Sequence, residues 1–303
     1  MNKPLRLNAL LLVSTAICFP SLADDSAEGD EKSWTDWFTD NGIELRKSFA
    51  GTVKDQSSPA QIAYFNPDGK DEFFNIDAAL KVEAIELDKK KLNFRAYPVL
   101  EKHKSNNEQS KVDKESVAIN TEADVFVGDS FILTNLNYAV SRDKQNDITT
   151  RSTALFATYS WSGDFAFGRT TLIGKEWELY YLPSIGYEQY DNLPIEEKLD
   201  GVQTVIAEAV DENFQVARVE GQIKPYFKKL DSKLVINFAY TKRWLVGSAD
   251  VVPGTTDFTE IAVTYYIDDK KSVGVALNYT NGQSPGRNFL DEENSSVGLN
   301  IKF

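Results

Sequence analysis

Few residues of this chain have side chains suited to covalent or metal chemistry. The only histidine, His103, stands two residues before a serine in the string 103–106, which reads His-Lys-Ser-Asn. The only cysteine, Cys18, lies in an apolar run near the start, so the rest of the chain offers no disulfide or cysteine nucleophile. Carboxylates alone could bind a metal, and the acidic stretch 24–31 would attract Ca²⁺ only weakly because such runs are usually solvated. We therefore expect no metal and no cofactor.

The string 103–106 is similar to the active-site string of two outer-membrane families, phospholipase A and the lipid A deacylases. In those enzymes the histidine activates a serine two residues further on, and an Asn or Glu of the next strand orients the imidazole. The resemblance implies Ser105 as nucleophile and His103 as base, with Glu115 or Asn120 as the third member. Three features weigh against it. The alternation of the strand sends His103 inward, whereas those lipases use the lipid-facing surface; the small residue that usually follows Ser-Asn is missing; and the surrounding residues are typical of a solvated loop. Hydrolysis is therefore the alternative hypothesis.

The start of the chain predicts export. Lys3 and Arg6 precede an apolar run too short to span a bilayer, and small residues lead up to Ala23. These features predict a signal peptide, 1–23, that is cleaved after Ala23. The acidic leader that follows, 24–41, could form a short helix or a plug at the periplasmic mouth, or it could be disordered.

The composition limits the function classes. The whole chain has a net charge of −13, and removal of 1–23 leaves 31 Lys and Arg against 46 Asp and Glu, a net charge of −15. This balance argues against a nucleic-acid binder, which needs a basic face. No later stretch approaches 18 apolar residues, so helical membrane spans are excluded. The mean hydropathy of −0.37 is compatible with a membrane barrel, in which polar lumen residues alternate with apolar ones.

The last residues alternate strictly between apolar and polar. A strand places alternate side chains on opposite faces, so one face carries an apolar row: Val297, Leu299, Ile301 and Phe303. This ending resembles that of Gram-negative outer-membrane β-barrels, whose last strand carries alternating apolar residues and a terminal aromatic. The resemblance implies that these four residues are the signal read by the barrel-assembly machinery and that the protein is located in the cell outer membrane.

The same alternation recurs along the chain, with polar links between the segments. It predicts strands in 75–87, 92–103, 115–127, 131–141, 151–161, 179–188, 218–227, 234–243, 258–267, 272–281 and 295–303. One more strand somewhere in 42–65 makes 12, an even number, as expected for a barrel whose two ends lie on the periplasmic side. The segment 165–173 could be a further strand, but a single extra strand would break the parity, so we interpret it as part of a longer periplasmic link.

These patterns predict an all-β fold, a closed antiparallel transmembrane β-barrel of about 12 strands over 42–303. The rival fold is a soluble β-sandwich, which also alternates. Strands of 10–13 residues and aromatic residues near strand ends, among them Tyr187, Tyr190 and Trp244, favour the membrane barrel.

The polar face of the predicted strands carries charges of both signs. The residues expected to line the lumen are Asp77, Lys81, Glu83, Arg95, Glu101, Glu122, Asp124, Glu188, Arg218, Glu220, Lys224, Arg243 and Glu260. They could line a small hydrophilic pore, or they could pair across a narrow lumen and seal it, because unpaired charges there are costly.

The predicted function is therefore that of a non-enzymatic outer-membrane barrel, either a narrow porin-like channel for small solutes or a closed structural or surface barrel. A solitary autotransporter-like barrel of 12 strands also fits the shape. The expected partners are outer-membrane lipid, lipopolysaccharide and the barrel-assembly machinery, with no nucleic acid. The sequence leaves the oligomeric state open, and the short loops favour a monomer.

Overall fold

The computed structural model describes residues 43–46, 60–65, 73–89, 91–105, 112–144, 146–160, 170–173, 176–199, 202–225, 233–247, 254–268, 271, 273–283 and 291–301. The chain divides into two units, Met1–Ser33 and Trp34–Phe303, and every described residue belongs to the second unit. The predicted signal peptide 1–23, the leader 24–41 and Phe303 lie outside the described residues.

All regular structure in the described part of the chain is β-strand. The strands are β1 (Ile43–Arg46), β2 (Ala60–Phe65), β3 (Phe73–Val82), β4 (Ile85–Lys89), β5 (Leu92–Ser105), β6 (Val112–Val127), β7 (Ser130–Asp143), β8 (Ile148–Ser160), β9 (Thr171–Ile173), β10 (Trp177–Leu199), β11 (Val202–Pro225), β12 (Leu234–Leu245), β13 (Thr255–Tyr266), β14 (Val273–Gln283) and β15 (Asp291–Ile301). The described residues contain no helix that is long and apolar enough to cross a membrane.

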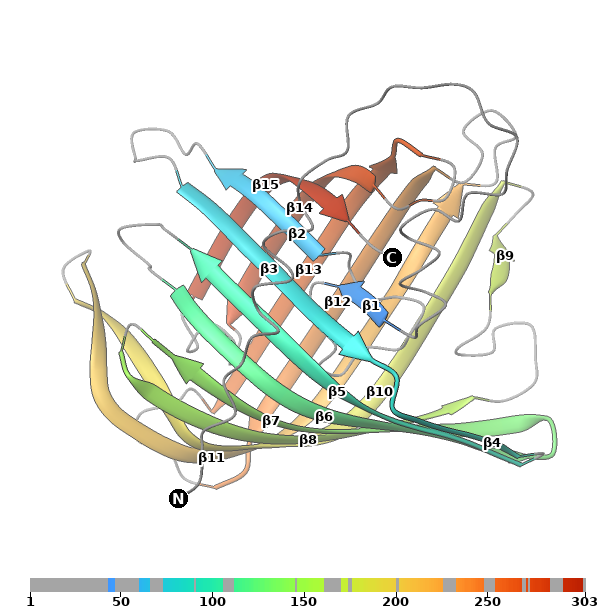
Figure 1. Ribbon diagram of the computed structural model, residues 1–303, viewed down its shortest axis with the longest axis horizontal. Helices are drawn as coiled ribbons and strands as arrows, with labels where there is room; N and C mark the ends of the chain where they lie inside the picture. The colour runs from blue at the N-terminus through green and yellow to red at the C-terminus, as the bar shows by residue number, and fades with distance from the viewer. Residues whose placement is uncertain are drawn as a thin grey trace, which may run out of the picture. The chain divides into compact units, whose positions relative to one another are not determined.

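Twelve of these strands form one closed antiparallel ring (Figure 1). The order around the ring is β2, β3, β5, β6, β7, β8, β10, β11, β12, β13, β14 and β15. The first strand of the ring, β2, pairs with the last, β15, through Ile62 and Leu299. The predicted closed antiparallel barrel of about 12 strands is confirmed.

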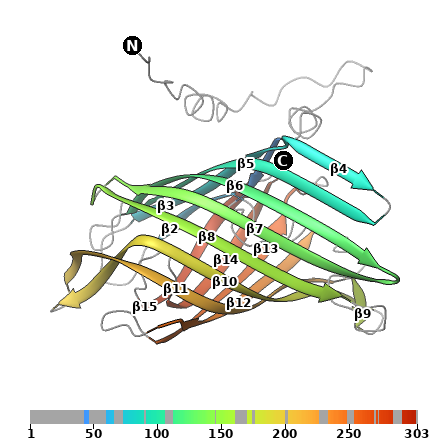
Figure 2. The same ribbon diagram turned by 90° about the horizontal axis from the view of Figure 1, so that it is seen from below.

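The remaining short strands extend members of the ring. β1 and β2 both pair with β3, Ile43 with Val82 and Gln61 with Asp77, so the first wall position is built from two pieces. β4 continues the line of β3 beside β5, as Figure 2 shows. β9 pairs with the start of β10, Thr171 with Leu179, so the segment 165–173 supplies a short pairing strand and not a thirteenth member of the ring.

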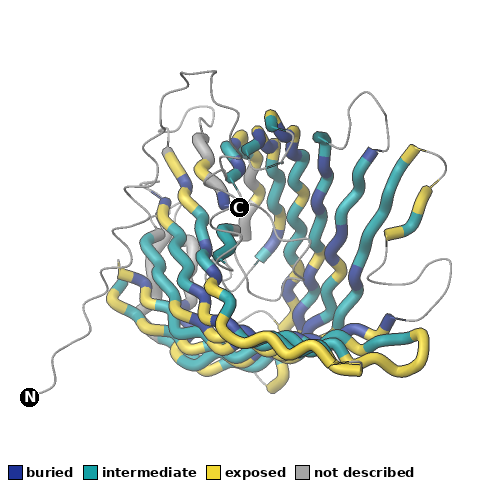
Figure 3. Tube along the Cα trace, turned by 45° about the vertical axis from the view of Figure 1, so that its right-hand side comes forward, coloured by how far each residue is buried: buried dark blue, intermediate teal, exposed yellow. Residues whose placement is uncertain are grey.

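Burial alternates along the wall strands (Figure 3). On β14, Val275 and Leu277 are 44% and 59% exposed, whereas Gly274 and Ala276 are buried. Large apolar side chains therefore cover the outer face, and the inner face carries small and polar residues. This arrangement suits a wall with lipid outside and an aqueous lumen inside. At the tight turn between β6 and β7, Gly128 has a φ of +62°, which glycine adopts without steric cost.

The hairpin of β10 and β11 is longer than the sequence predicted. The two strands have 23 and 24 residues, and their register shifts between Tyr190 and Leu193. Leu193 and Phe214 form a buried apolar cluster with Phe156 and Val216. The placement of Tyr190 in an aromatic belt facing lipid is wrong, because its ring packs edge-on against Phe214 with centroids 6.0 Å apart. Packing within this buried cluster stabilises the parts of the two strands whose sequence lacks the apolar alternation.

Candidate functional lumen

The structure places the thirteen predicted lumen residues on the buried side of the alternation. Lys81, Glu188, Glu220 and Arg243 are buried, and the other nine are half-buried. Residues directly opposite in an antiparallel pair share a face, and Arg95 of β5 stands opposite Glu122 of β6. The inner face therefore brings charges of both signs next to one another on neighbouring strands.

His103 lies between two carboxylates on this inner face. Its Nδ1 is 2.9 Å from Oδ1 of Asp77 on β3, the residue directly opposite, and its Nε2 is 3.5 Å from Oε2 of Glu101. Ser116 of β6 donates a hydrogen bond of 3.5 Å to the same Glu101 oxygen. Both ring nitrogens of His103 therefore face carboxylates. The hydroxyl of Ser116 points to the Glu101 carboxylate and not to the imidazole.

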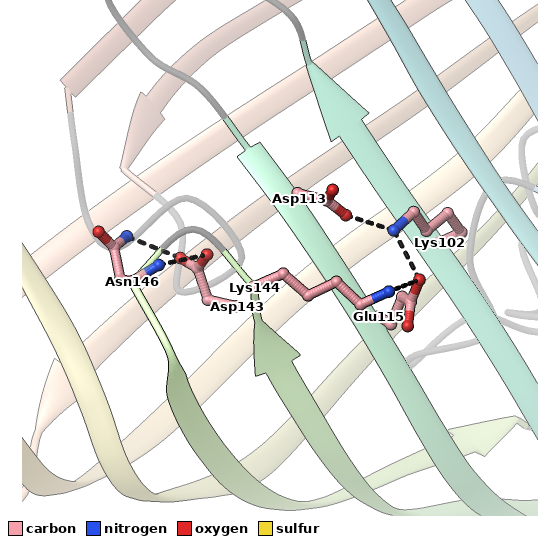
Figure 4. Close-up of polar contacts among 6 residues, drawn as sticks. All are labelled: Lys102, Asp113, Glu115, Asp143, Lys144 and Asn146. Atoms are coloured by element: carbon pink, nitrogen blue, oxygen red, sulfur yellow. Dashed lines mark hydrogen bonds and ion pairs between the residues drawn. The ribbon is translucent and has the colours of Figure 1, made fainter.

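The residues of the hydrolase hypothesis are held apart by the alternation of β6. Glu115 shares the outer face with Val117 and accepts hydrogen bonds from Lys102 and Lys144, as Figure 4 shows. Asn120 is on the inner face, where its side-chain oxygen accepts a hydrogen bond from Asn137 of β7. The two proposed third members therefore lie on opposite faces of β6, Glu115 with Lys102 and Lys144 and Asn120 with Asn137.

A second inner cluster lies on β3 to β6. Arg95 Nε is 3.1 Å from Oε1 of Glu86 and 4.0 Å from Oε1 of Glu83. Tyr97 donates a hydrogen bond to Glu122 of β6. On the neighbouring strand, Lys81 Nζ is 3.2 Å from Oε1 of Glu44 of β1 and 4.4 Å from the centre of the Tyr97 ring. Lys81 and Tyr97 are both buried, so this part of the wall is covered by large side chains packed flat against it.

A third inner cluster lies on β10 to β12. Arg243 donates a pair of hydrogen bonds to the carboxylate of Glu188, of 2.7 and 3.3 Å. Tyr190 donates to the same carboxylate over 3.1 Å. Arg218 and Glu220, two residues apart on β11, form an ion pair of 3.1 Å. The charges of this wall are therefore neutralised within the wall itself.

The inner face of β14 and β15 is different, because its described residues from Gly274 to Thr280 and from Ser296 to Asn300 have small or medium-sized side chains. Asn300 donates a hydrogen bond of 3.0 Å to Thr264, and Gly274, Ala276 and Gly298 lie between or beside them. Small residues project little into the lumen. This side of the barrel leaves more room next to the wall than the two clusters with large charged side chains.

The pairs within these clusters run along the wall. Asp77 and His103 are on neighbouring strands, as are Tyr97 and Glu122, whereas Arg243 and Glu188 are separated by one strand. The remaining predicted lumen residues, Asp124, Lys224 and Glu260, are half-buried on the same face. The contact between Asp77 and His103 could not be predicted from the sequence, because it depends on strand register. The contact with Glu101 could have been predicted, because Glu101 lies two residues before His103 on the same face of β5.

Some inner polar groups have no hydrogen-bond partner among the described residues. Both side-chain atoms of Asn135, which is 5% exposed, and Oγ1 of Thr256 are buried without a hydrogen bond in the described part of the chain. Buried amides and hydroxyls are nearly always hydrogen-bonded, to water where protein groups are out of reach. These positions therefore fit a hydrated lumen. No cluster of three or more His, Cys, Asp or Glu residues in the described ranges has an arrangement that could bind a metal.

On the last strand, the predicted assembly row lies on the outer face. Val297 is 52% exposed, Leu299 and Ile301 are half-exposed, and the intervening Gly298 and Asn300 are buried. Phe303 lies outside the described residues. The outer row of β15 is continuous with the outer apolar face of β14, because Val275 stands opposite Leu299.

Comparisons with known proteins give similarity of fold alone. No family model and no curated protein sequence matches the chain. The chain is similar to the translocator domain of the autotransporter NalP from Neisseria meningitidis, with 11% identity over 86% of this chain and 88% of that one and a TM-score of 0.40. It is also similar to the NanC porin, with 10% identity over 81% of this chain and 100% of that one and a TM-score of 0.43. The β domain of the Bordetella autotransporter BrkA shows 6% identity over 86% of this chain and 98% of that one, with a TM-score of 0.39. The fold itself is a closed antiparallel β-barrel of twelve strands, with an apolar outer face and a more polar inner face.

Proposed function

We propose that this protein is a narrow water-filled channel for small hydrophilic solutes and that it has no catalytic activity. The observation that carries the proposal is the direction of the inner ion pairs. Asp77 with His103 and Arg243 with Glu188 each join strands that are neighbours or next neighbours in the wall.

The direction of these pairs matters because charges in a narrow space must be compensated. A sealed barrel could compensate them by bridges across the axis. Bridges along the wall compensate them equally well and keep the long side chains flat against their own strands. The unpartnered amide of Asn135 adds support, because a hydrated lumen supplies its missing hydrogen bonds.

The strand number sets the expected width. An eight-stranded barrel is filled by its own side chains, and barrels of 16–18 strands leave a wide aqueous channel. A ring of twelve lies between these cases. The small inner residues of β14 and β15 would then form the open side of the channel.

Conductance in planar bilayers tests this function. Asn278 is on the inner face of β14, where it donates a hydrogen bond to Ser296, and the adjacent Leu277 is on the outer face and 59% exposed. We expect discrete conductance steps from the purified protein. Asn278→Trp should lower the step size by at least about half, because the indole enters a lumen that is narrow at this strand number. Leu277→Trp should leave the step unchanged.

The rival outcome is a closed structural barrel. Folded protein that shows heat-modifiable migration on gels but gives no steps would overturn the channel proposal. Equal effects of the two tryptophan variants would overturn it as well, since the current would then not pass along the inner face of β14.

A further inference from the structure

The outer face of β5 to β8 changes character towards one rim. On β5 the outward positions pass from Leu100 to Lys102 and Lys104, and on β7 they pass from Val140 to Arg142. Arg151 of β8 stands opposite Val140 and faces outward at the same level. The apolar outer surface of these strands is therefore bordered by cations.

The cations lie side by side across the strands. Lys102 stands opposite Glu115, and Glu115 stands opposite Arg142, so the three form one row over β5, β6 and β7. Lys102 Nζ is 2.7 Å from Oε1 of Glu115 and also contacts Asp113. Lys144 contacts the same Glu115 oxygen from the turn after β7 (Figure 4).

This surface is basic on a strongly acidic protein. We define the basic arc as its five cations, Lys102, Lys104, Arg142, Lys144 and Arg151, which outnumber the four carboxylates among and beside them, Asp113, Glu115, Asp147 and Asp191, the last of which stands directly opposite Arg151. The arc therefore has a net charge of +1 in a chain of −13. The outward positions of β13 and β15 at the same rim carry Asp257 and Glu293 instead. The outward charges on that side are therefore acidic, apart from Lys242, which stands opposite Asp257.

The cations of the arc are accessible to a ligand. Lys104 and Arg151 are exposed, and the described residues give neither of them an ion pair. The ion pair of Arg142 with Asp147 has side chains that are 62% and 80% exposed. Exposed ion pairs contribute little to stability, so an anion that offers several oxygens can replace such a carboxylate.

The level of the arc indicates which anion it meets. The links of two residues between β4 and β5 and between β6 and β7 lie at the opposite rim, and short turns are typical of the periplasmic side of a membrane barrel. The arc then borders the outer leaflet, which in this membrane is made of lipopolysaccharide. We propose that the basic arc binds the phosphate groups of lipid A. The apolar strand surface below it, including Val117 and Leu136, which are 51% and 42% exposed, would contact the acyl chains.

A binding measurement on the full-length barrel, purified from outer membranes and delipidated in detergent, tests the proposal. The probes are bisphosphorylated lipid A and the same lipid with its phosphates removed. The double variant Lys104→Gln, Arg151→Gln should bind bisphosphorylated lipid A about 30-fold more weakly, as expected for the loss of two cations at an anionic surface. Lys242→Gln is the matched control, because Lys242 is an outward cation on β12, outside the basic arc, with its Nζ 5.9 Å from the centre of the Trp244 ring. The affinity of this variant for bisphosphorylated lipid A should stay unchanged.

The other outcomes decide against the proposal. Equal affinity for the dephosphorylated lipid would show that acyl chains alone are recognised. Displacement of the lipid by millimolar inorganic phosphate would show a free-anion site. Binding that requires Mg²⁺ and is lost in Glu115→Gln, yet is unchanged in the double variant, would assign recognition to the carboxylates. Heat-modifiable migration of each variant verifies that the barrel is folded.

Discussion

Arg243 and Glu188 form a two-pronged ion pair across an intervening strand. Arg243 is on β12 and Glu188 on β10, with Val216 of β11 opposite Arg243 in the register. The Nε and Nη2 atoms lie 2.7 and 3.3 Å from the two carboxylate oxygens. The side chains are 11% and 6% exposed. The pair therefore links three neighbouring strands at the inner face.

Glu188→Gln tests the energetic role of this pair. The amide keeps the shape of the side chain but leaves Arg243 as a buried cation without its counter-charge. We expect the free energy of unfolding to fall by about 3 kcal/mol, measured by urea titration of the barrel in lipid vesicles. The control is Arg142→Gln, which removes an ion pair whose side chains are 62% and 80% exposed and should cost less than about 1 kcal/mol. A smaller loss for Glu188→Gln than for the control would contradict this interpretation.

Two glycines make room for aromatic rings directly opposite them. Gly186 faces Phe156 of β8, and Gly221 faces Phe238 of β12. A Cβ at Gly221 would lie 2.6 Å from the carbonyl oxygen of Tyr180, and one at Gly186 would lie 2.5 Å from the Phe156 ring. Aromatic side chains that cover a glycine of the neighbouring strand fix its register.

Substitution of either glycine by alanine should destabilise the barrel. Overpacking of this kind costs about 1–3 kcal/mol, and the loss should appear as a lower temperature for the gel-mobility transition of the barrel. Gly254→Ala is the matched control, because nothing lies within 4 Å of the Cβ that it would add. Retention of full stability in both Gly186→Ala and Gly221→Ala would show that the rings move aside freely.

The charge of the predicted lumen sets its ion preference. Its thirteen charged residues comprise five cations and eight anions, so a channel lined by them should favour cations. The reversal potential in a KCl gradient should have the sign of a K⁺-selective channel. Asp124→Asn should move the reversal potential towards zero. Asp147→Asn should leave it unchanged, because the Asp147 side chain is on the outer surface and 80% exposed. Anion selectivity of the unaltered protein would refute the lumen assignment.

The hydrolase alternative has its own test. His103 faces Asp77 and Glu101, and Glu115 faces two lysines on the outer surface. We expect no phospholipid or lipid A hydrolysis above background from the purified protein, and no difference for Ser105→Ala or His103→Ala, measured by release of fatty acid. Hydrolysis that disappears in both variants but persists in Glu101→Gln would revive the triad hypothesis.

The strands themselves were largely readable from the sequence. The segments 92–103, 115–127 and 131–141 fall within strands of the ring, because side-chain alternation is a local property of extended chain. The long hairpin of β10 and β11 was not predicted, since residues 189–217 lack a lipid-facing row and depend on the inward packing of Leu193 and Phe214. The divided first wall position, β1 and β2, was equally hard to define, because each piece is only a few residues long.

The sequence by itself determined which side of the wall most residues of the regular strands would occupy, Tyr190 excepted, because lipid on one face and water on the other impose a period of two on a strand. The same alternation predicted that His103 points inward, and in the structure Glu115 lies with Val117 on the other face. Only the tertiary structure decided the partners within a face. The contact of His103 with Asp77 joins residues 26 positions apart, and it depends on the register between β3 and β5. Register is fixed by hydrogen bonding and packing of strands around the closed ring, and no local pattern in a single strand encodes it.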